Sequence, residues 1–140
     1  MALYVVIYVF ILAVFAILDG IWLSQMGAAL YKPVLGDILT DNVRIAPAIV
    51  FYLLYPIGIE VFAVLPALRA NSLQYAAVYA ALFGLLAYAT YDLTNYATLR
   101  NWTASITMID LAWGAFVSGA SATVAFLASR AVMAHFDLKL

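Results

Sequence analysis

The chain has 140 residues, of which 69% are hydrophobic and 9% are charged, and its mean hydropathy is +1.08. Soluble domains carry about 45–50% apolar and about 25% charged residues, so these few polar side chains cannot cover a soluble core, and the composition is that of an integral membrane protein. Six dispersed Lys and Arg residues and a net charge of −1 exclude a basic nucleic-acid surface. The absence of cysteine and the single histidine, His135, argue against disulfides, thiolate chemistry and a His-based zinc site.

Four stretches are long and apolar enough to cross a membrane, since a span needs about 20 residues. They cover residues 2–23, 45–68, 73–97 and 105–129, and we expect them to form a single transmembrane domain over residues 1–140. The connections at 69–72 and 99–104 are short, which forces neighbouring spans to run antiparallel. The predicted fold is therefore all-α, an integral membrane four-helix bundle that runs up, down, up and down.

The first connection, residues 24–44, is longer than the other two. Apolar residues such as Leu30, Val34 and Leu35 are interleaved there with Lys32 and Asp37. This pattern is typical of a short helix lying in the membrane interface or of a lid over one end of the bundle, and it is equally compatible with an ordinary loop. The six basic residues divide evenly between the two sides of the membrane, so their distribution does not set the orientation.

Four acidic residues lie inside the predicted spans, namely Asp19, Glu60, Asp92 and Asp110. A charge at the middle of a bilayer costs about 2.5–3.5 kcal/mol, and such residues usually face the bundle interior and mark a functional path. The antiparallel order of the spans places the three aspartates in the same half of the membrane and Glu60 in the other half. We therefore expect one cluster of three aspartates and a separate glutamate, which has either a structural or a functional role. Tyr52 is interpreted as a packing or interfacial residue.

The aspartates share helix faces with aromatic and amide side chains, because residues three or four apart lie on one side of a helix. The pairs are Asp19 with Trp22, Tyr88 with Asp92, Asp92 with Asn95, and Asp110 with Trp113. An indole N–H can donate to a carboxylate, and its ring can shield the site from lipid. The alternative is that these aspartates and tryptophans only anchor the helix ends at the membrane interface.

Span four also carries a ridge of small residues, Gly114, Ser118 and Ala122. Small residues four apart allow helix backbones to approach closely in lipid. We interpret the ridge as a packing face, and it offers a surface for a homodimer or a membrane-protein partner.

Three short motifs carry a resemblance to a known family. The run Tyr-Asp-x-Thr-Asn at 91–95 and the two Asp-x-x-Trp motifs at 19–22 and 110–113 resemble a bacterial family of small four-span predicted inner-membrane proteins of unknown function. The similarity covers essentially the whole chain. It implies a multi-pass protein of the bacterial inner (plasma) membrane with signature positions Asp19, Trp22, Asp92, Thr94, Asn95, Asp110 and Trp113. It also implies a link to lipid chemistry, since members of that family occur beside genes that modify membrane fatty acids.

These observations favour a protein that handles or modifies a lipid or another hydrophobic small molecule. The expected catalytic residues are Asp92, as the proton-transfer group, together with Asp19 and Asp110. The expected substrate-binding residues are Trp22, Tyr88, Tyr91, Thr94, Asn95 and Trp113. No cofactor and no metal are expected, although three carboxylates offer oxygen ligands for Mg²⁺. Whether the protein is an enzyme stays open, because a non-catalytic assembly or scaffold subunit and a small proton-coupled carrier are alternatives.

Overall fold

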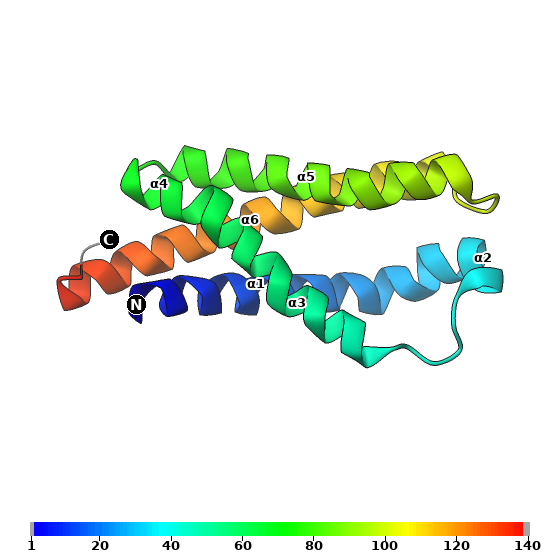
Figure 1. The fold of residues 1–140 in the computed structure, drawn as a ribbon, viewed down its shortest axis with the longest axis horizontal. Helices are drawn as coiled ribbons and strands as arrows, with labels where there is room; N and C mark the ends of the chain where they lie inside the picture. The colour runs from blue at the N-terminus through cyan, green and yellow to red at the C-terminus, as the bar shows by residue number, and fades with distance from the viewer. Residues whose placement is uncertain (1, 139–140) are drawn as a thin grey trace.

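The computed structural model describes residues 2–138, which form four long helical units packed side by side (Figure 1). The first unit consists of α1 (Ala2–Met26), η1 (Gly27–Tyr31), α2 (Lys32–Leu35) and η2 (Gly36–Ile38). The second consists of α3 (Ile45–Ile59), η3 (Glu60–Val64) and α4 (Leu65–Arg69). The third is α5 (Leu73–Thr98) and the fourth is α6 (Ala104–Phe136). Each unit is long and apolar enough to cross a membrane, which confirms the predicted all-α fold with four spans.

The four units form two kinds of contact. Helix α5 packs along α6, and α6 packs along α1, whereas α3 crosses α1 obliquely (Figure 1). The core between them is apolar and includes Ile7, Ile11 and Phe15 of α1 and Ile59 of α3. The outer faces are also apolar, as expected for helices that contact lipid on one side and protein on the other. Both ends of the described chain lie at the same end of the bundle (Figure 1).

Helices α5 and α6 approach most closely at two glycines. A Cβ atom added to Gly84 would lie 2.0 Å from the carbonyl oxygen of Gly114 and 2.3 Å from Ser118 Oγ. Ser118 also forms a 2.9 Å hydrogen bond with the hydroxyl of Tyr55 on α3. The ridge formed by Gly114, Ser118 and Ala122 is therefore buried inside the chain, between α6 and its neighbours. A contact with a second copy or another protein stays a prediction, and in this conformation it would need a different face.

Two turns of π-helix interrupt the first and second units, and each comes just before a proline. In η1 the N–H of Lys32 bonds to the carbonyl of Gly27, and Pro33 follows. In η3 the N–H of Leu65 bonds to the carbonyl of Glu60, and Pro66 follows. A proline lacks an N–H and its ring collides with the carbonyl four residues earlier, so a widened turn accommodates it without breaking the helix.

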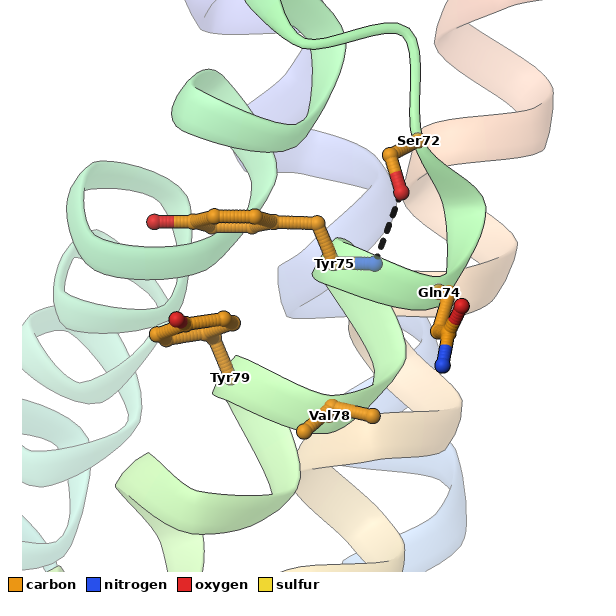
Figure 2. A pocket seen from close by; sticks show the side chains of 5 residues that line it. All are labelled: Ser72, Gln74, Tyr75, Val78 and Tyr79. Atoms are coloured by element: carbon orange, nitrogen blue, oxygen red, sulfur yellow. Dashed lines mark hydrogen bonds between the residues drawn. The ribbon is translucent and has the colours of Figure 1, made fainter.

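Short connections with capping residues begin the last two units. The hydroxyl of Ser72 accepts a 3.2 Å hydrogen bond from the N–H of Tyr75 at the start of α5 (Figure 2). Asn71, with a φ of 49°, makes the tight turn before it. The hydroxyl of Thr103 accepts a 3.2 Å hydrogen bond from the N–H of Ile106 at the start of α6. Each cap satisfies an N–H group that has no partner within its own helix.

The first connection is mostly a helical segment over one end of the bundle, which is one of the alternatives that the sequence leaves open, and only its last residues form a loop. The helical path of α1 continues through η1, α2 and η2 as far as Ile38, and only residues 39–44 are non-helical. Leu35 is buried against Trp102 in the last connection and Ile106 in the first turn of α6. The interleaved apolar residues of this segment therefore form a helical arm, residues 27–38, that packs over one end of the bundle. Hydropathy alone ended the span at residue 23 because polar residues appear there, although the backbone stays helical beyond it.

Candidate functional site

Asp19 on α1 accepts two hydrogen bonds from aromatic side chains of other helices. The indole Nε1–H of Trp113 on α6 donates to Asp19 Oδ1 over 3.0 Å. The hydroxyl of Tyr52 on α3 donates to Asp19 Oδ2. Both carboxylate oxygens are thus occupied, and the side chain is buried. Asp19 therefore ties α1 to both α3 and α6, which is a structural as well as an electrostatic role.

Asp110 on α6 is held by a relay from the helical arm. The hydroxyl of Tyr31 on η1 donates to Asp110 Oδ1 and accepts a 3.1 Å hydrogen bond from the indole Nε1–H of Trp22 on α1. The widened turn at η1 carries Tyr31, so the proline-induced distortion of the arm places this hydroxyl beside Asp110. The arm is thereby attached to the interior of the bundle through one tyrosine.

The indole rings of Trp22 and Trp113 stack, with their centroids 4.3 Å apart and an angle of 9° between their planes. Each tryptophan is linked by hydrogen bonds to the aspartate of the other helix. Trp113, three residues after Asp110, donates to Asp19, and Trp22, three residues after Asp19, reaches Asp110 through Tyr31. The two Asp-x-x-Trp motifs therefore form one crossed unit across the α1–α6 interface, and its stacked rings form an apolar wall.

Asp92 on α5 is the exception among the three aspartates. Its side chain is 0% exposed, and neither of its carboxyl oxygens has a hydrogen-bond partner within the described residues. The carboxyl group of Asp110 is close enough to interact with it. A buried polar group without a partner costs free energy, so native structures rarely contain one without a reason. Asp92 therefore offers two free acceptor atoms inside the cluster.

The remaining sequence-predicted binding residues separate into two groups. Tyr88 is half-buried, packs its ring against Gly114, and meets the ring of Tyr55 edge-on at 6.4 Å between centroids. Asn95 is also half-buried, one turn of α5 beyond Asp92. Tyr88 and Asn95 thus lie on the side of α5 that carries Asp92, as their spacing predicts.

Tyr91 and Thr94, in contrast, are not brought into the cluster. Tyr91 is 59% exposed and meets the ring of Trp102 edge-on. Thr94 is exposed, and its hydroxyl donates to the carbonyls of Thr90 and Tyr91 in its own helix. Residues one or two positions from Asp92 point to other sides of a helix. The prediction of Tyr91 and Thr94 as binding residues therefore followed the sequence motif and not the helix geometry.

Two residues of the cluster were missed from the sequence. Tyr31 lies in the first connection, for which the sequence leaves a helix, a lid and a loop as alternatives, so the sequence does not set its depth. Tyr52 was interpreted as a packing or interfacial residue, and the structure shows that its hydroxyl binds Asp19. The depth of Tyr52 in span two, about level with Asp19 in the antiparallel span one, is the signal that would have identified it.

Glu60 lies apart from the aspartates. It is the first residue of η3, in the half of the second unit that is farther from the helical arm. Its side chain is 7% exposed, and its Oε1 atom has no hydrogen-bond partner. Within residues 2–138, no three acidic or histidine side chains converge in a way that could hold a metal ion. The buried acidic residues are instead the Asp92–Asp110 pair, the hydrogen-bonded Asp19 and the isolated Glu60.

Two surface hollows flank the bundle, and neither is lined by an aspartate. One, of about 350 Å³, lies at the arm end and is lined by Ile38, Thr98, Leu99, Arg100 and Asn101. The other, of about 260 Å³, lies at the opposite end of α5 (Figure 2) and is lined by Ser72, Gln74, Tyr75, Val78 and Tyr79. In it the rings of Tyr75 and Tyr79 stack 4.0 Å apart. Neither hollow therefore opens onto the aspartate cluster.

Comparison with known proteins gives a family but no activity. The model of a family described as "Predicted membrane protein (DUF2177)" matches residues 4–127, nearly the whole chain. None of the curated proteins and none of the solved structures matches the chain.

Proposed function

We propose that the aspartate cluster of this chain, which belongs to the predicted membrane protein family DUF2177, binds the polar end of a lipid or another hydrophobic small molecule. Asp92 and Asp110 are the groups that exchange a proton with this ligand. The single observation that carries the proposal is the carboxyl group of Asp92, which is wholly buried and has no hydrogen-bond partner within the described residues. A hydroxyl or amine group on the ligand would supply the missing donor.

The neighbouring carboxyl group of Asp110 supports proton exchange at this place. Two carboxyl groups that lie close together in a water-poor interior repel each other when both are ionised, so a state in which one of them carries a proton is favoured. The protonated member can donate to a ligand while the ionised member accepts from it, which is the arrangement needed for general acid–base chemistry. The hydroxyl of Tyr31 donates a hydrogen bond to Asp110 and holds its carboxyl group in place.

The surroundings of the pair favour a hydrophobic ligand. The outer faces of all four units are apolar and suited to hydrocarbon, and the side chains of Asp92 and Asp110 are buried between helices. A molecule that reaches them must cross an apolar environment with its polar group directed inward. We infer that this molecule comes from the membrane itself. The family resemblance further suggests that this membrane is the bacterial inner membrane.

A scaffold function is the second candidate, and the bonding of Asp19 favours it. Asp19 connects three helical units through Tyr52 and Trp113, as a residue with a purely structural role would. Asp92 distinguishes the two functions, because a carboxyl group without a partner holds no helices together.

The test compares lipid extracts from cells of the source organism that lack the gene. These cells are complemented with the wild type, with Asp92→Asn, or with Asp37→Asn as a matched control at an exposed aspartate on the arm. We expect mass spectrometry to find a lipid species or ratio that the wild type and Asp37→Asn restore and Asp92→Asn does not. Full restoration by Asp92→Asn at equal protein levels would contradict the proposal and favour the scaffold function.

A further inference from the structure

Glu60 is the one buried acidic side chain that the aspartate cluster does not use. It begins η3, 15 residues after Ile45 and nine before Arg69, the ends of the second unit. At 1.5 Å per residue these intervals correspond to about 22 Å and about 14 Å along the helix axis. Glu60 therefore lies deep in the hydrocarbon region, towards the end of the bundle that is opposite to the arm.

No group in the described part of the chain compensates a charge on Glu60. Its Oε1 atom is buried and accepts no hydrogen bond. The elements packed against η3 are α1, α5 and α6, together with α3 and α4 of its own unit. None of them brings a charged or titratable side chain into interaction with the carboxyl group of Glu60. The nearest residues of its own turn that are buried, Ile59, Ala63 and Val64, are apolar.

An isolated carboxylate in such a place is strongly unfavourable, and a group of this kind takes up a proton instead. The neutral acid needs only one donor and one acceptor to be satisfied, and Glu60 keeps 7% of its surface exposed, so it is not completely sealed inside the bundle. The π turn widens the backbone at this residue, a feature that is frequent at functional sites.

We propose that Glu60 is a proton-binding site of its own, a neutral carboxylic acid that exchanges its proton at the π turn η3, in the half of the membrane away from the aspartate cluster. The site is independent of the ligand that the aspartates bind. A result that overturns the Glu60 site would therefore leave the proposed function of the aspartates unaffected, and the reverse also holds.

A hydrophobic carbodiimide tests this proposal, because the reagent enters hydrocarbon and reacts with neutral carboxylic acids. The carboxyl proton moves to one carbodiimide nitrogen while the carboxyl oxygen bonds to the central carbon. The acyl group then moves to the other nitrogen and leaves a stable N-acylurea, with no leaving group. The full chain in membranes is treated with dicyclohexylcarbodiimide, digested and mapped by mass spectrometry.

We expect an adduct on the peptide that contains Glu60 in mildly acidic buffer and several-fold less of it in alkaline buffer. Glu60→Gln removes this adduct, and the exposed Asp37 stays unlabelled by the hydrophobic reagent in both buffers. A water-soluble carbodiimide should give the reverse preference, because it reaches Asp37 and not the hydrocarbon region.

Infrared spectroscopy provides a second measurement that does not depend on access of the reagent. The spectrum of the wild type minus that of Glu60→Gln should contain the carbonyl band of a protonated carboxyl group, and the melting temperature should be unchanged by this substitution. A carboxylate band in place of the acid band would overturn the proposal, as would labelling of Glu60 that is equal in acidic and alkaline buffer.

Discussion

The indole of Trp113 on α6 donates its N–H to the carboxylate of Asp19 on α1, over 3.0 Å and across 94 positions of sequence. This contact is part of the crossed arrangement in which hydrogen bonds link the tryptophan of each Asp-x-x-Trp motif to the aspartate of the other helix. It joins the first and last spans of the bundle. The contact also restricts the rotation of α1 and α6 about their axes.

Trp113→Phe is expected to destabilise the bundle by about 1–3 kcal/mol, because it leaves one oxygen of a buried carboxylate without a donor. The melting temperature of the purified protein measures this loss. Asp19→Ala removes the same interaction from the other side, so the double variant should lose less than the sum of the two single losses. Additive losses would show that the contact does not stabilise the protein.

Gly84→Ala is expected to destabilise the α5–α6 pair by about 1–3 kcal/mol, because a Cβ atom there would meet the backbone of Gly114 and force the helices apart. Gly20→Ala is the matched control, since nothing lies within 4 Å of a Cβ atom at Gly20 in α1. Alanine should stabilise that position by about 0.5–1 kcal/mol through its higher helix propensity. Equal melting temperatures for the two variants would contradict the close approach of α5 and α6.

Tyr31→Phe is expected to loosen the arm formed by residues 27–38, because it removes the hydrogen bond described between the arm and Asp110. Hydrogen–deuterium exchange of the purified protein should show faster exchange in the arm, and unchanged exchange in α5. Tyr96→Phe, at an exposed tyrosine of α5, is the control. An arm that exchanges at the wild-type rate in Tyr31→Phe would show that Leu35 and its neighbours hold it without the tyrosine.

The sequence predicts how far along its helix each of the four buried acidic residues lies, and the structure agrees for these residues. Four apolar stretches and two short connections are sufficient to place Asp19, Asp92 and Asp110 in one half of the membrane and Glu60 in the other. The i to i+3 spacing also places Tyr88 and Asn95 on the side of α5 that carries Asp92. These features depend only on helix rise, helix period and antiparallel order.

The rotation and tilt of each helix could not be predicted in the same way. The crossed pairing of Trp22 and Trp113 depends on how far α1 and α6 turn about their axes, which hydropathy leaves undetermined. Tyr52 reaches Asp19 because α3 crosses α1 obliquely, and Tyr31 reaches Asp110 because the backbone widens before Pro33. Both are results of tertiary packing and of local distortion at a proline, and neither changes the pattern of apolar residues.

The central claim is that Asp92 binds the polar group of a hydrophobic ligand, and native mass spectrometry of the purified protein tests it most directly. The wild type and Asp37→Asn should retain a co-purifying hydrophobic molecule when they are released from mild detergent. Asp92→Ala should retain it about 10- to 100-fold less well, as expected for the loss of a hydrogen bond to a charged group worth about 1.5–3 kcal/mol. Retention of the same molecule at the same occupancy by Asp92→Ala would contradict the claim, as would a wild-type protein that carries no such molecule.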